Sequence, residues 1–352
     1  MTTKKFSLTI ICVSLGYSYF VILVNFLFNP FQIFPMNIFK FTGSTQERYL
    51  KIEHLKSNRN YKIILLGSSR MGVNDPSEVS KKEADKSVYN LYVSSGNQYD
   101  NLVHTNWLLD NYPNLETIYM QIDWPESYGP FDKSYLQYRH HPDISGVTNI
   151  NFIMDYLMFL SLPALDFKYK NNFIKQGEYI VDYKNGNYYY PIKDRSLALN
   201  CNHYTATVSD FTQNRVENKF SHEQNKLNQL SLTAIEKIVK KATERKVAIK
   251  VFITPYNHKF LDTINLEQYS DFIYKLSKIT EFWNFAFYSD ITNNNCNYYE
   301  TSHYAPNLTN RLFTFLKSPV DNDRNVRYIN QQNVADQLKY INTNFVQFRS
   351  NH

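Results

Sequence analysis

The sequence predicts an α/β fold, in which helices cover both faces of a parallel sheet, preceded by one transmembrane helix. From residue 60 onward, short apolar segments alternate with longer helical segments, a pattern typical of βαβ units. An apolar run near the N-terminus has about the ~20 residues that a bilayer span requires. The 352 residues suffice for one large domain or two small ones, with a sizeable core.

The N-terminal segment predicts the compartment. Lys4 and Lys5 precede an apolar run at 6–28, whose one strongly polar residue is Asn25. Cationic residues before the run predict a cytoplasmic N-terminus and an extracytoplasmic body. A cleaved signal peptide and a buried core helix are the alternatives. We favour an uncleaved anchor, because signal cleavage needs small residues and the first alanine of the chain is Ala84.

The elements beyond the anchor follow in alternating order. Each expected strand is a short apolar run that ends in small or polar residues, and the expected helices between them are longer. In chain order they are a helix at 45–57, strands at 62–66 and 87–93, a helix at 99–110, a strand at 117–122, a helix at 232–245, a strand at 247–253, a helix at 269–280 and a strand at 285–288.

An insertion interrupts this pattern. The expected organisation is a cytoplasmic stub and anchor at 1–30, a juxtamembrane linker at 31–59, an α/β domain at 60–317 with an insertion at 126–230, and a C-terminal helical tail at 318–352. Residues 151–162 predict a helix that is too short to span a bilayer, so it either lies on the membrane or caps the site. Residues 177–192 alternate around Asn185-Gly186, a hairpin signal. We expect the insertion to shape a substrate groove beside the active site.

Composition excludes some classes of function. The net charge of +6 is spread along the chain, without the basic stripe that nucleic-acid binding needs, so no nucleic-acid partner is expected. Cys201 and Cys296 both lie in the predicted extracytoplasmic part, which permits a disulfide, although two free thiols are the alternative. Neither cysteine has ligands at metal-binding spacing, so we expect no metal site and no cofactor.

Two short clusters far apart in the chain point to chemistry. The strand at 62–66 runs into Gly-Ser-Ser-Arg at 67–70, which places a serine at the carboxyl edge of the sheet, where open α/β folds bind ligands. Near the other end, Glu300 lies three residues before His303. A serine hydroxyl needs a general base, and the base needs an orienting group. These residues predict a serine esterase or acyltransferase site; a helix N-cap serine and a surface histidine are the alternatives.

With these motifs the chain resembles the SGNH (GDSL-type) hydrolases. Ile-Leu-Leu-Gly-Ser-Ser-Arg at 64–70 is similar to the first family block in its Gly-Ser-Ser variant, found in membrane-anchored members such as the D-alanyl-lipoteichoic-acid protein family and bacterial polysaccharide O-acetylation proteins. Asn-Leu-Tyr-Val-Ser-Ser-Gly at 90–96 is similar to the second block, and Glu-x-x-His-Tyr at 300–304 to the last, normally Asp-x-x-His. The resemblance covers roughly residues 60–317 and implies a three-layer, flavodoxin-like sheet.

The resemblance also implies roles for single residues. Ser69 aligns with the nucleophile, and Ser68 occupies the slot of the family's aspartate. His303 aligns with the general base and Glu300 with the group that orients it. The backbone amides of Ser69 and Gly96 are then expected to bind the oxyanion.

The third family block supplies an asparagine to the oxyanion hole, and residues 122–124 lack it. We take the literal Gly-x-Asn-Asp at 72–75 as coincidence, because it lies directly after the nucleophile. Either Asn97 substitutes or the hole is reduced, and one donor is worth ~10²–10³ in rate. Arg70 contacts an anionic group of the substrate or pairs with a scaffold carboxylate, and we favour the scaffold. His258 could line the groove, although a polar surface role is favoured.

Together these features predict a single-pass protein of the bacterial inner (cytoplasmic) membrane with a periplasmic or other extracytoplasmic catalytic domain. The expected reaction transfers or hydrolyses O-acyl groups, foremost acetyl, on an envelope polysaccharide or its precursor. A membrane-bound protein that donates the acyl group fits as a partner. One alternative is a catalytically degenerate envelope assembly or glycan-binding protein. Another is a lipase or thioesterase on membrane lipids, with an apolar tunnel beneath residues 151–162.

Overall fold

The computed structural model separates the chain into two compact units. It describes residues 3–29, 31–34, 46–125, 128–129, 136–158, 180–212, 222–319 and 323–350. The larger unit comprises Leu55–Pro130 and Asp182–His352, and the smaller unit comprises Met1–His54 and Phe131–Val181.

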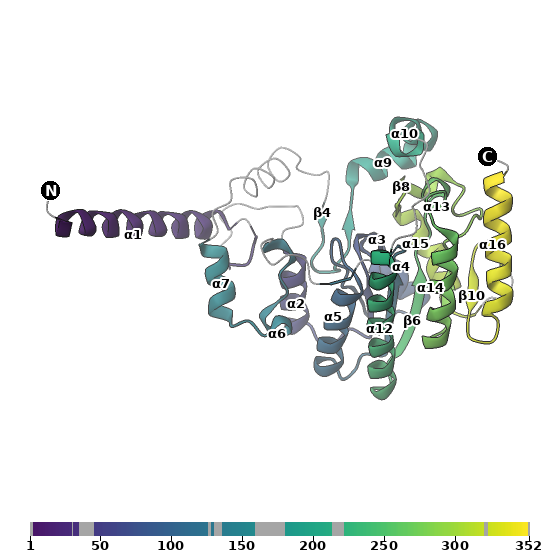
Figure 1. The fold of residues 1–352 in the computed structure, drawn as a ribbon, viewed down its shortest axis with the longest axis horizontal. Coiled ribbons are helices and arrows are strands. Elements are labelled where there is room, and N and C mark those ends of the chain that lie inside the picture. Colours follow the sequence, from purple (N-terminus) through teal and green to yellow (C-terminus); the bar gives the residue numbers. More distant parts are fainter. Residues whose placement is uncertain are drawn as a thin grey trace. The chain divides into compact units, whose positions relative to one another are not determined.

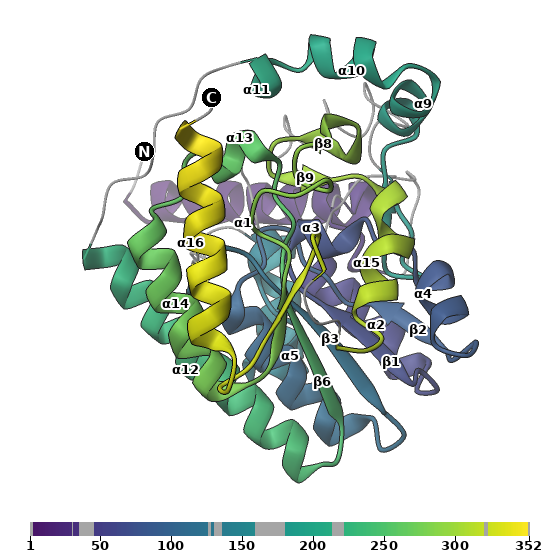
Figure 2. The ribbon, with the colours of Figure 1, turned by 90° about the vertical axis from the view of Figure 1, so that its right-hand side faces the viewer.

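A mostly parallel sheet forms the centre of the larger unit and confirms the predicted α/β fold class (Figures 1 and 2). Its strands are β1 (Ile63–Leu66), β2 (Val88–Asn90), β3 (Thr117–Ile122), β6 (Ala248–Ile253), β7 (Phe282–Asn284) and β10 (Arg327–Ile329). The six strands have the order β10-β7-β6-β3-β1-β2, in which β10 alone is antiparallel to its neighbour. The other five therefore follow the flavodoxin-like order.

Helices cover both faces of this sheet. The helices of the larger unit, apart from α9 to α11, are α3 (Ser69–Gly72), α4 (Pro76–Lys82), α5 (Gln98–Asn111), α12 (His222–Glu244), α13 (His258–Leu261), α14 (Leu266–Ile279), α15 (Thr309–Phe315) and α16 (Val334–Ser350) among the described residues. Helices α5, α12, α14 and α16 pack in a row over one face, and α4 packs with α15 over the other (Figure 2). Successive side chains of β3 point to the two helical layers in turn. Met120 joins the core beneath α12 and α14, whereas the centroid of the Tyr119 ring lies 5.0 Å from that of Phe313 in α15.

Two details of the predicted sheet were wrong. The last parallel strand lies at Phe282–Asn284 rather than at 285–288. The expected helical tail at 318–352 contains β10 as well as α16. Strand β10 is only three residues long and begins with Arg327, so its sequence lacks the apolar run by which the other strands are recognised. Within the sheet that arginine is buried and its guanidinium lies 3.4 Å from the centroid of the Tyr340 ring.

Among the described residues before α12, the predicted insertion consists of short elements. They are η1 (Leu136–Tyr138), α6 (Pro142–Ser145), α7 (Asn149–Leu157), β4 (Ile180–Val181), β5 (Tyr188–Tyr189), α9 (Pro191–Leu199), α10 (Cys201–Thr207) and α11 (Ser209–Thr212). The expected helix at 151–162 corresponds to α7, and residues 159–162 lie outside the described residues. The turn of the expected hairpin is formed by Asn185 and Gly186, and Gly186 adopts a φ of 84° that favours glycine.

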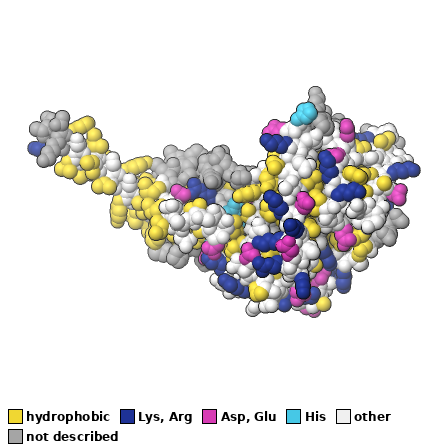
Figure 3. All heavy atoms as spheres, turned by 60° about the horizontal axis from the view of Figure 1, so that its bottom comes forward, with side chains coloured by type: hydrophobic (Ala, Val, Ile, Leu, Met, Phe, Trp, Pro, Cys, Tyr) yellow, Lys and Arg dark blue, Asp and Glu magenta, His cyan; other side chains and the backbone are white. Residues whose placement is uncertain are grey.

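The smaller unit contains α1 (Thr3–Phe28) and most of α2 (Glu47–Ser57). Its segment Lys5–Phe28 is long and apolar enough to cross a membrane, a property that anchors and signal sequences share. Hydrophobic side chains cover α1 along its length (Figure 3). The N-terminal apolar helix expected from the sequence is therefore present.

Candidate active site

The turn after β1 carries Ser69. Gly67 is required there, because a Cβ at this position would lie 2.8 Å from the Gln121 side chain and 2.9 Å from that of Met71. Ser68 is the N-cap of α3 and its side chain accepts a hydrogen bond from the Arg70 N–H at 3.2 Å. An N-cap role was the alternative for Ser69. The structure gives that role to Ser68, and Ser69 is the first residue of α3.

A hydrogen-bonded chain links Ser69 to His303 and Glu300. The two partners lie opposite each other in the hairpin of β8 (Tyr298–Glu300) and β9 (His303–Tyr304). The Ser69 Oγ lies 2.8 Å from His303 Nε2, and His303 Nδ1 bonds to the Glu300 carboxylate. The structure therefore brings together all three residues that the sequence predicts as catalytic, in the order hydroxyl, imidazole and carboxylate.

Ser302 holds the carboxylate in this hairpin through two hydrogen bonds, and no motif in the sequence singles this residue out. Its N–H donates to Glu300 Oε2 at 2.9 Å and its hydroxyl donates to Oε1 at 2.8 Å. These bonds hold the Glu300 side chain in place. The turn at residues 301–302 lies between Glu300 and His303, and the carboxylate stays beside the imidazole.

The same contacts determine the acidity of Glu300. Burial alone would raise the pKa of its carboxyl, but the hydrogen bond and charge of His303, with the bonds from Ser302, outweigh burial and lower the pKa to about 2. The carboxyl is therefore ionised throughout the neutral range. It can accept a hydrogen bond from the imidazole and stabilise the imidazolium.

Replacing Glu300 by glutamine should lower the free energy of unfolding at neutral pH, and this deficit should fade in acid. A carboxyl whose pKa is lower in the folded state stabilises the fold above its unfolded pKa, and the stabilisation is lost as the pH falls through the folded pKa. The difference between the wild type and Glu300→Gln should thus shrink between pH 4.5, the ordinary value, and about 2. Urea unfolding across that range measures it. A deficit that stays constant down to the acid end would contradict the assignment.

Asp123 lies at the centre of a second network, which the sequence analysis did not foresee. It follows β3, and its carboxylate accepts hydrogen bonds from the hydroxyls of Ser68 and Thr254, the residue after β6. Arg70 Nη1 lies 3.0 Å from the same carboxylate. Polar residues directly after two neighbouring parallel strands meet at one edge of a sheet, so this network follows once β3 and β6 are known to be neighbours.

Arg70 connects this network to the histidine hairpin. Its Nε donates to the Ser302 carbonyl at 2.7 Å while Nη1 pairs with Asp123, and its guanidinium lies 5.3 Å from the centroid of the Tyr256 ring. Two roles were considered for Arg70, contact with an anionic substrate group and pairing with a scaffold carboxylate. The structure shows the second, with Asp123 as the carboxylate. The arginine joins the nucleophile turn, the end of β3 and the hairpin that carries the base.

The other predicted site residues have partners of their own. The Gly96 N–H, expected in the oxyanion hole, donates to the Val93 carbonyl at 2.8 Å. Asn97 caps α5, and its Nδ2 donates to the Gly129 carbonyl at 3.0 Å. His258 begins α13, and its ring centroid lies 6.1 Å from that of Phe348 in α16. The roles proposed for these residues in catalysis and substrate binding stay predictions.

A disulfide braces the strand that carries Glu300. Cys201 in α10 is bonded to Cys296 in η3 (Asn295–Asn297), with Cα atoms 5.5 Å apart, which confirms the predicted pairing. The Tyr204 hydroxyl, also in α10, donates to the Tyr299 carbonyl at 2.9 Å. Helix α10 is thus attached both before β8 and within it, so the position of the carboxylate depends on this part of the insertion.

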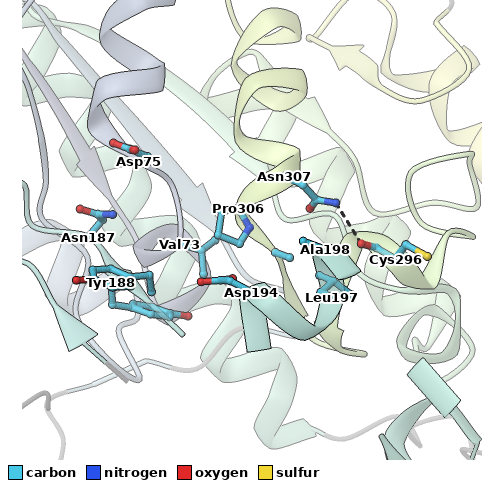
Figure 4. Close-up of a pocket in the computed structure, with 12 residues that line it drawn as sticks. Val73, Asp75, Asn187, Tyr188, Asp194, Leu197, Ala198, Cys296, Pro306 and Asn307 are labelled. Atoms are coloured by element: carbon cyan, nitrogen blue, oxygen red, sulfur yellow. Dashed lines mark hydrogen bonds between the residues drawn. The ribbon is translucent and has the colours of Figure 1, made fainter. Parts of the chain in front are cut away.

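A pocket of ≈ 470 Å³ borders the helix of the nucleophile (Figure 4). Its lining comprises Val73, Asp75, Asn187, Tyr188, Tyr189, Asp194, Leu197, Ala198, Cys296, Ala305, Pro306 and Asn307. The Tyr188 ring packs on Gly72, the last residue of α3, where a Cβ would lie 2.6 Å from the ring. Aromatic and apolar walls with a few amide and carboxylate groups are typical of sites for small organic groups.

The site therefore combines a hydroxyl, a base and an ionised carboxylate at the carboxyl edge of a parallel sheet. Such an arrangement can activate the hydroxyl as a nucleophile toward a carbonyl carbon. No protein-family model matches the chain, and no curated protein matches it.

Proposed function

We propose that this protein is an SGNH-like serine enzyme that transfers or hydrolyses O-acyl groups, foremost acetyl, on an envelope polysaccharide or its precursor. The observation that carries the proposal is the chain from Ser69 Oγ through His303 to Glu300, with 2.8 Å between hydroxyl and imidazole. That distance is within the range for proton transfer between a nucleophile and its base. The flavodoxin-like strand order, with the serine after the first strand, supports the same superfamily.

The proposed reaction has two steps. The Ser69 Oγ attacks the acyl carbonyl carbon while His303 Nε2 accepts the hydroxyl proton, and Glu300 stabilises the imidazolium. The tetrahedral intermediate then expels the alcohol, which takes the proton from His303 and leaves an acyl-serine. A glycan hydroxyl or water next loses its proton to His303 and attacks the acyl carbon. The second tetrahedral intermediate then expels the Ser69 Oγ, which takes that proton back from His303, so that the free hydroxyl and the neutral imidazole are restored. The acceptor of the second step decides between transferase and esterase.

The proposed location is the bacterial inner membrane, with the N-terminus in the cytoplasm and the catalytic domain outside it. The apolar helix α1 and the Cys201–Cys296 disulfide both support an extracytoplasmic domain. Envelope glycans and their precursors are exposed there. A transferase would also need an acyl donor on that side of the membrane, for which a membrane-bound donor protein is the proposed partner.

The pocket beside α3 is the proposed contact for a sugar unit of the polymer. Tyr189 lines it and is 38 % exposed, so its ring offers an apolar face on which a sugar can stack. Replacing Tyr189 by alanine should raise the KM for an O-acetylated polysaccharide by roughly 10-fold, the value of about 1.4 kcal/mol of lost contact. The kcat/KM for a small chromogenic acetyl ester should stay unchanged.

Acetate release from the polymer, compared with hydrolysis of the small ester, measures both values. Tyr274→Ala is the matched control, because Tyr274 is 48 % exposed on α14 and does not line the pocket. Equal losses on both substrates would show that Tyr189 acts on the catalytic groups and would refute the subsite. Absence of acetate release from any glycan or ester would refute the enzymatic proposal.

A second candidate function is a glycan-binding or assembly protein of the envelope with a degenerate SGNH site. Asp123 favours it, because a carboxylate bonded to Ser68 and Arg70 stands at the strand end where the family's asparagine donor is expected. A carboxylate cannot donate a hydrogen bond to an oxyanion. Binding of the polysaccharide without turnover, unchanged in Ser69→Ala, would support this function over the enzyme.

A further inference from the structure

Helix α7 has two apolar faces, of which only one is buried. Phe152 and Tyr156 point into the core of the smaller unit, and each is 2 % exposed. The opposite face holds four large apolar side chains at helical spacing, and they are exposed to solvent. They are Ile150 (74 % exposed), Ile153 (38 %), Met154 (41 %) and the cap residue Met158 (45 %). A continuous exposed stripe of this kind marks an interaction surface.

This helix is attached to the end of α1. Asn25 Nδ2, in the last turn of α1, donates to the Leu157 carbonyl at 2.8 Å, and Asn25 is only 4 % exposed. Beyond α1, the rings of Phe31 and Phe34 join Phe152 and Tyr156 in one hydrophobic cluster. The end of α1 is thus part of the folded unit, which favours an anchor over a segment that is removed.

The length of α1 and the orientation of α7 also fit a bilayer. Lys5–Phe28 has 24 residues, about 36 Å of helix at ~1.5 Å per residue, whereas the hydrocarbon core is ~30 Å thick. The last turn of α1, with Asn25, therefore reaches the membrane interface when α1 spans the bilayer. Helix α7 runs across the direction of α1 rather than along it (Figure 1). An in-plane helix at the interface has this orientation.

We propose that α7 lies in the outer interface of the membrane, with Ile150, Ile153, Met154 and Met158 inserted between lipids. The lipid surface is the occupant because α7 is hydrogen-bonded to the last turn of α1, the helix whose exposed apolar side chains suit a bilayer. This inference rests on the transmembrane position of α1 in the proposed function and is independent of the catalytic chemistry. Besides the span, the protein would then have a second membrane contact that fixes the tilt of the smaller unit.

Site-directed fluorescence tests the contact in the full chain. The protein is reconstituted in phosphatidylethanolamine–phosphatidylglycerol nanodiscs, and an environment-sensitive fluorophore is attached to Ile150→Cys or Met154→Cys in a Cys12→Ser background. The other two cysteines form the disulfide and do not react. Asn151→Cys is the matched control, because Asn151 is an exposed polar residue of the same helix. Quenchers are supplied either on lipid chains or in the aqueous phase.

The label at Ile150 and Met154 should show blue-shifted emission and quenching by the lipid-borne quencher, while the label at Asn151 should respond to the aqueous quencher. Quenching of Ile150 from the aqueous phase alone would overturn the inference. So would a blue shift without quenching from either side, which would mean that protein covers the stripe. Labelling Cys12, exposed on α1, separates the two claims. If Cys12 contacts lipid and Ile150 does not, only the role of α7 fails; if Cys12 does not, the anchor fails.

Discussion

Replacing Ser69 or His303 by alanine should each lower kcat/KM by roughly 10⁴- to 10⁶-fold, and the double variant should lose little more. The reason is that the hydroxyl and the imidazole, 2.8 Å apart, act as one unit, so that removing either leaves the other without a function. Glu300→Gln should be milder, because it disturbs the orientation of the imidazole and leaves nucleophile and base in place. Acetate release from an O-acetylated glycan, or hydrolysis of a chromogenic acetyl ester, measures these losses.

Ser68→Ala is the matched control for the nucleophile. Ser68 is adjacent to Ser69 but caps α3 and bonds to Asp123, so its removal should cost about 1 kcal/mol of stability and retain most activity. Each variant is compared at equal concentrations of protein that circular dichroism shows to be folded. Full activity of folded Ser69→Ala would refute the nucleophile assignment and shift the case toward another catalytic residue or the binding protein.

Removing the disulfide should destabilise the larger unit by about 2–4 kcal/mol. Cys201 and Cys296 are 95 residues apart in the chain, so the bond restricts a long loop in the unfolded state. The double variant Cys201→Ser, Cys296→Ser should unfold at a lower urea concentration than the wild type. Its kcat should fall as well, because α10 holds the β8 strand that carries Glu300.

Cys12→Ser is the control for the disulfide variant, since Cys12 is a free cysteine on the exposed surface of α1. It should leave both the unfolding midpoint and the activity unchanged. An unfolding midpoint of the disulfide variant equal to that of the wild type would contradict the predicted stabilisation. Reduction of the wild type by dithiothreitol should reproduce the loss, and alkylation mass spectrometry should then count two additional thiols.

The sequence was sufficient to predict those strands whose apolar residues are the ones buried in the core. Strands β1 and β3 are short, largely apolar segments whose side chains are buried on both faces, so their length and apolar content identified them. Strand β10 was not predicted, because it is short and begins with Arg327, whose burial depends on the aromatic ring of Tyr340. Tyr340 lies in the next helix, α16, and a contact between two such separate elements leaves no local pattern in the sequence.

The site, too, has one part that was predictable from the sequence and one part that was not. Ser69 and the pair Glu300 and His303 were predictable because each lies in a short motif, and the structure brings them together. The network of Asp123 depends on which strands are neighbours in the sheet. Because the order of β3 and β6 beside β1 is a property of the topology, the bonds from Ser68 and Thr254 could not be derived from spacing alone.

The most direct test of the account is covalent labelling of the intact protein with a fluorophosphonate. An activated serine attacks phosphorus as it attacks a carbonyl, with His303 accepting the proton, so the reagent reports the nucleophile without knowledge of the natural substrate. Peptide mass spectrometry should locate a single phosphonyl group on Ser69, and labelling should be lost in His303→Ala. Labelling of a different residue, or no labelling of folded wild-type protein, would contradict the claim that Ser69 and His303 form a catalytic unit.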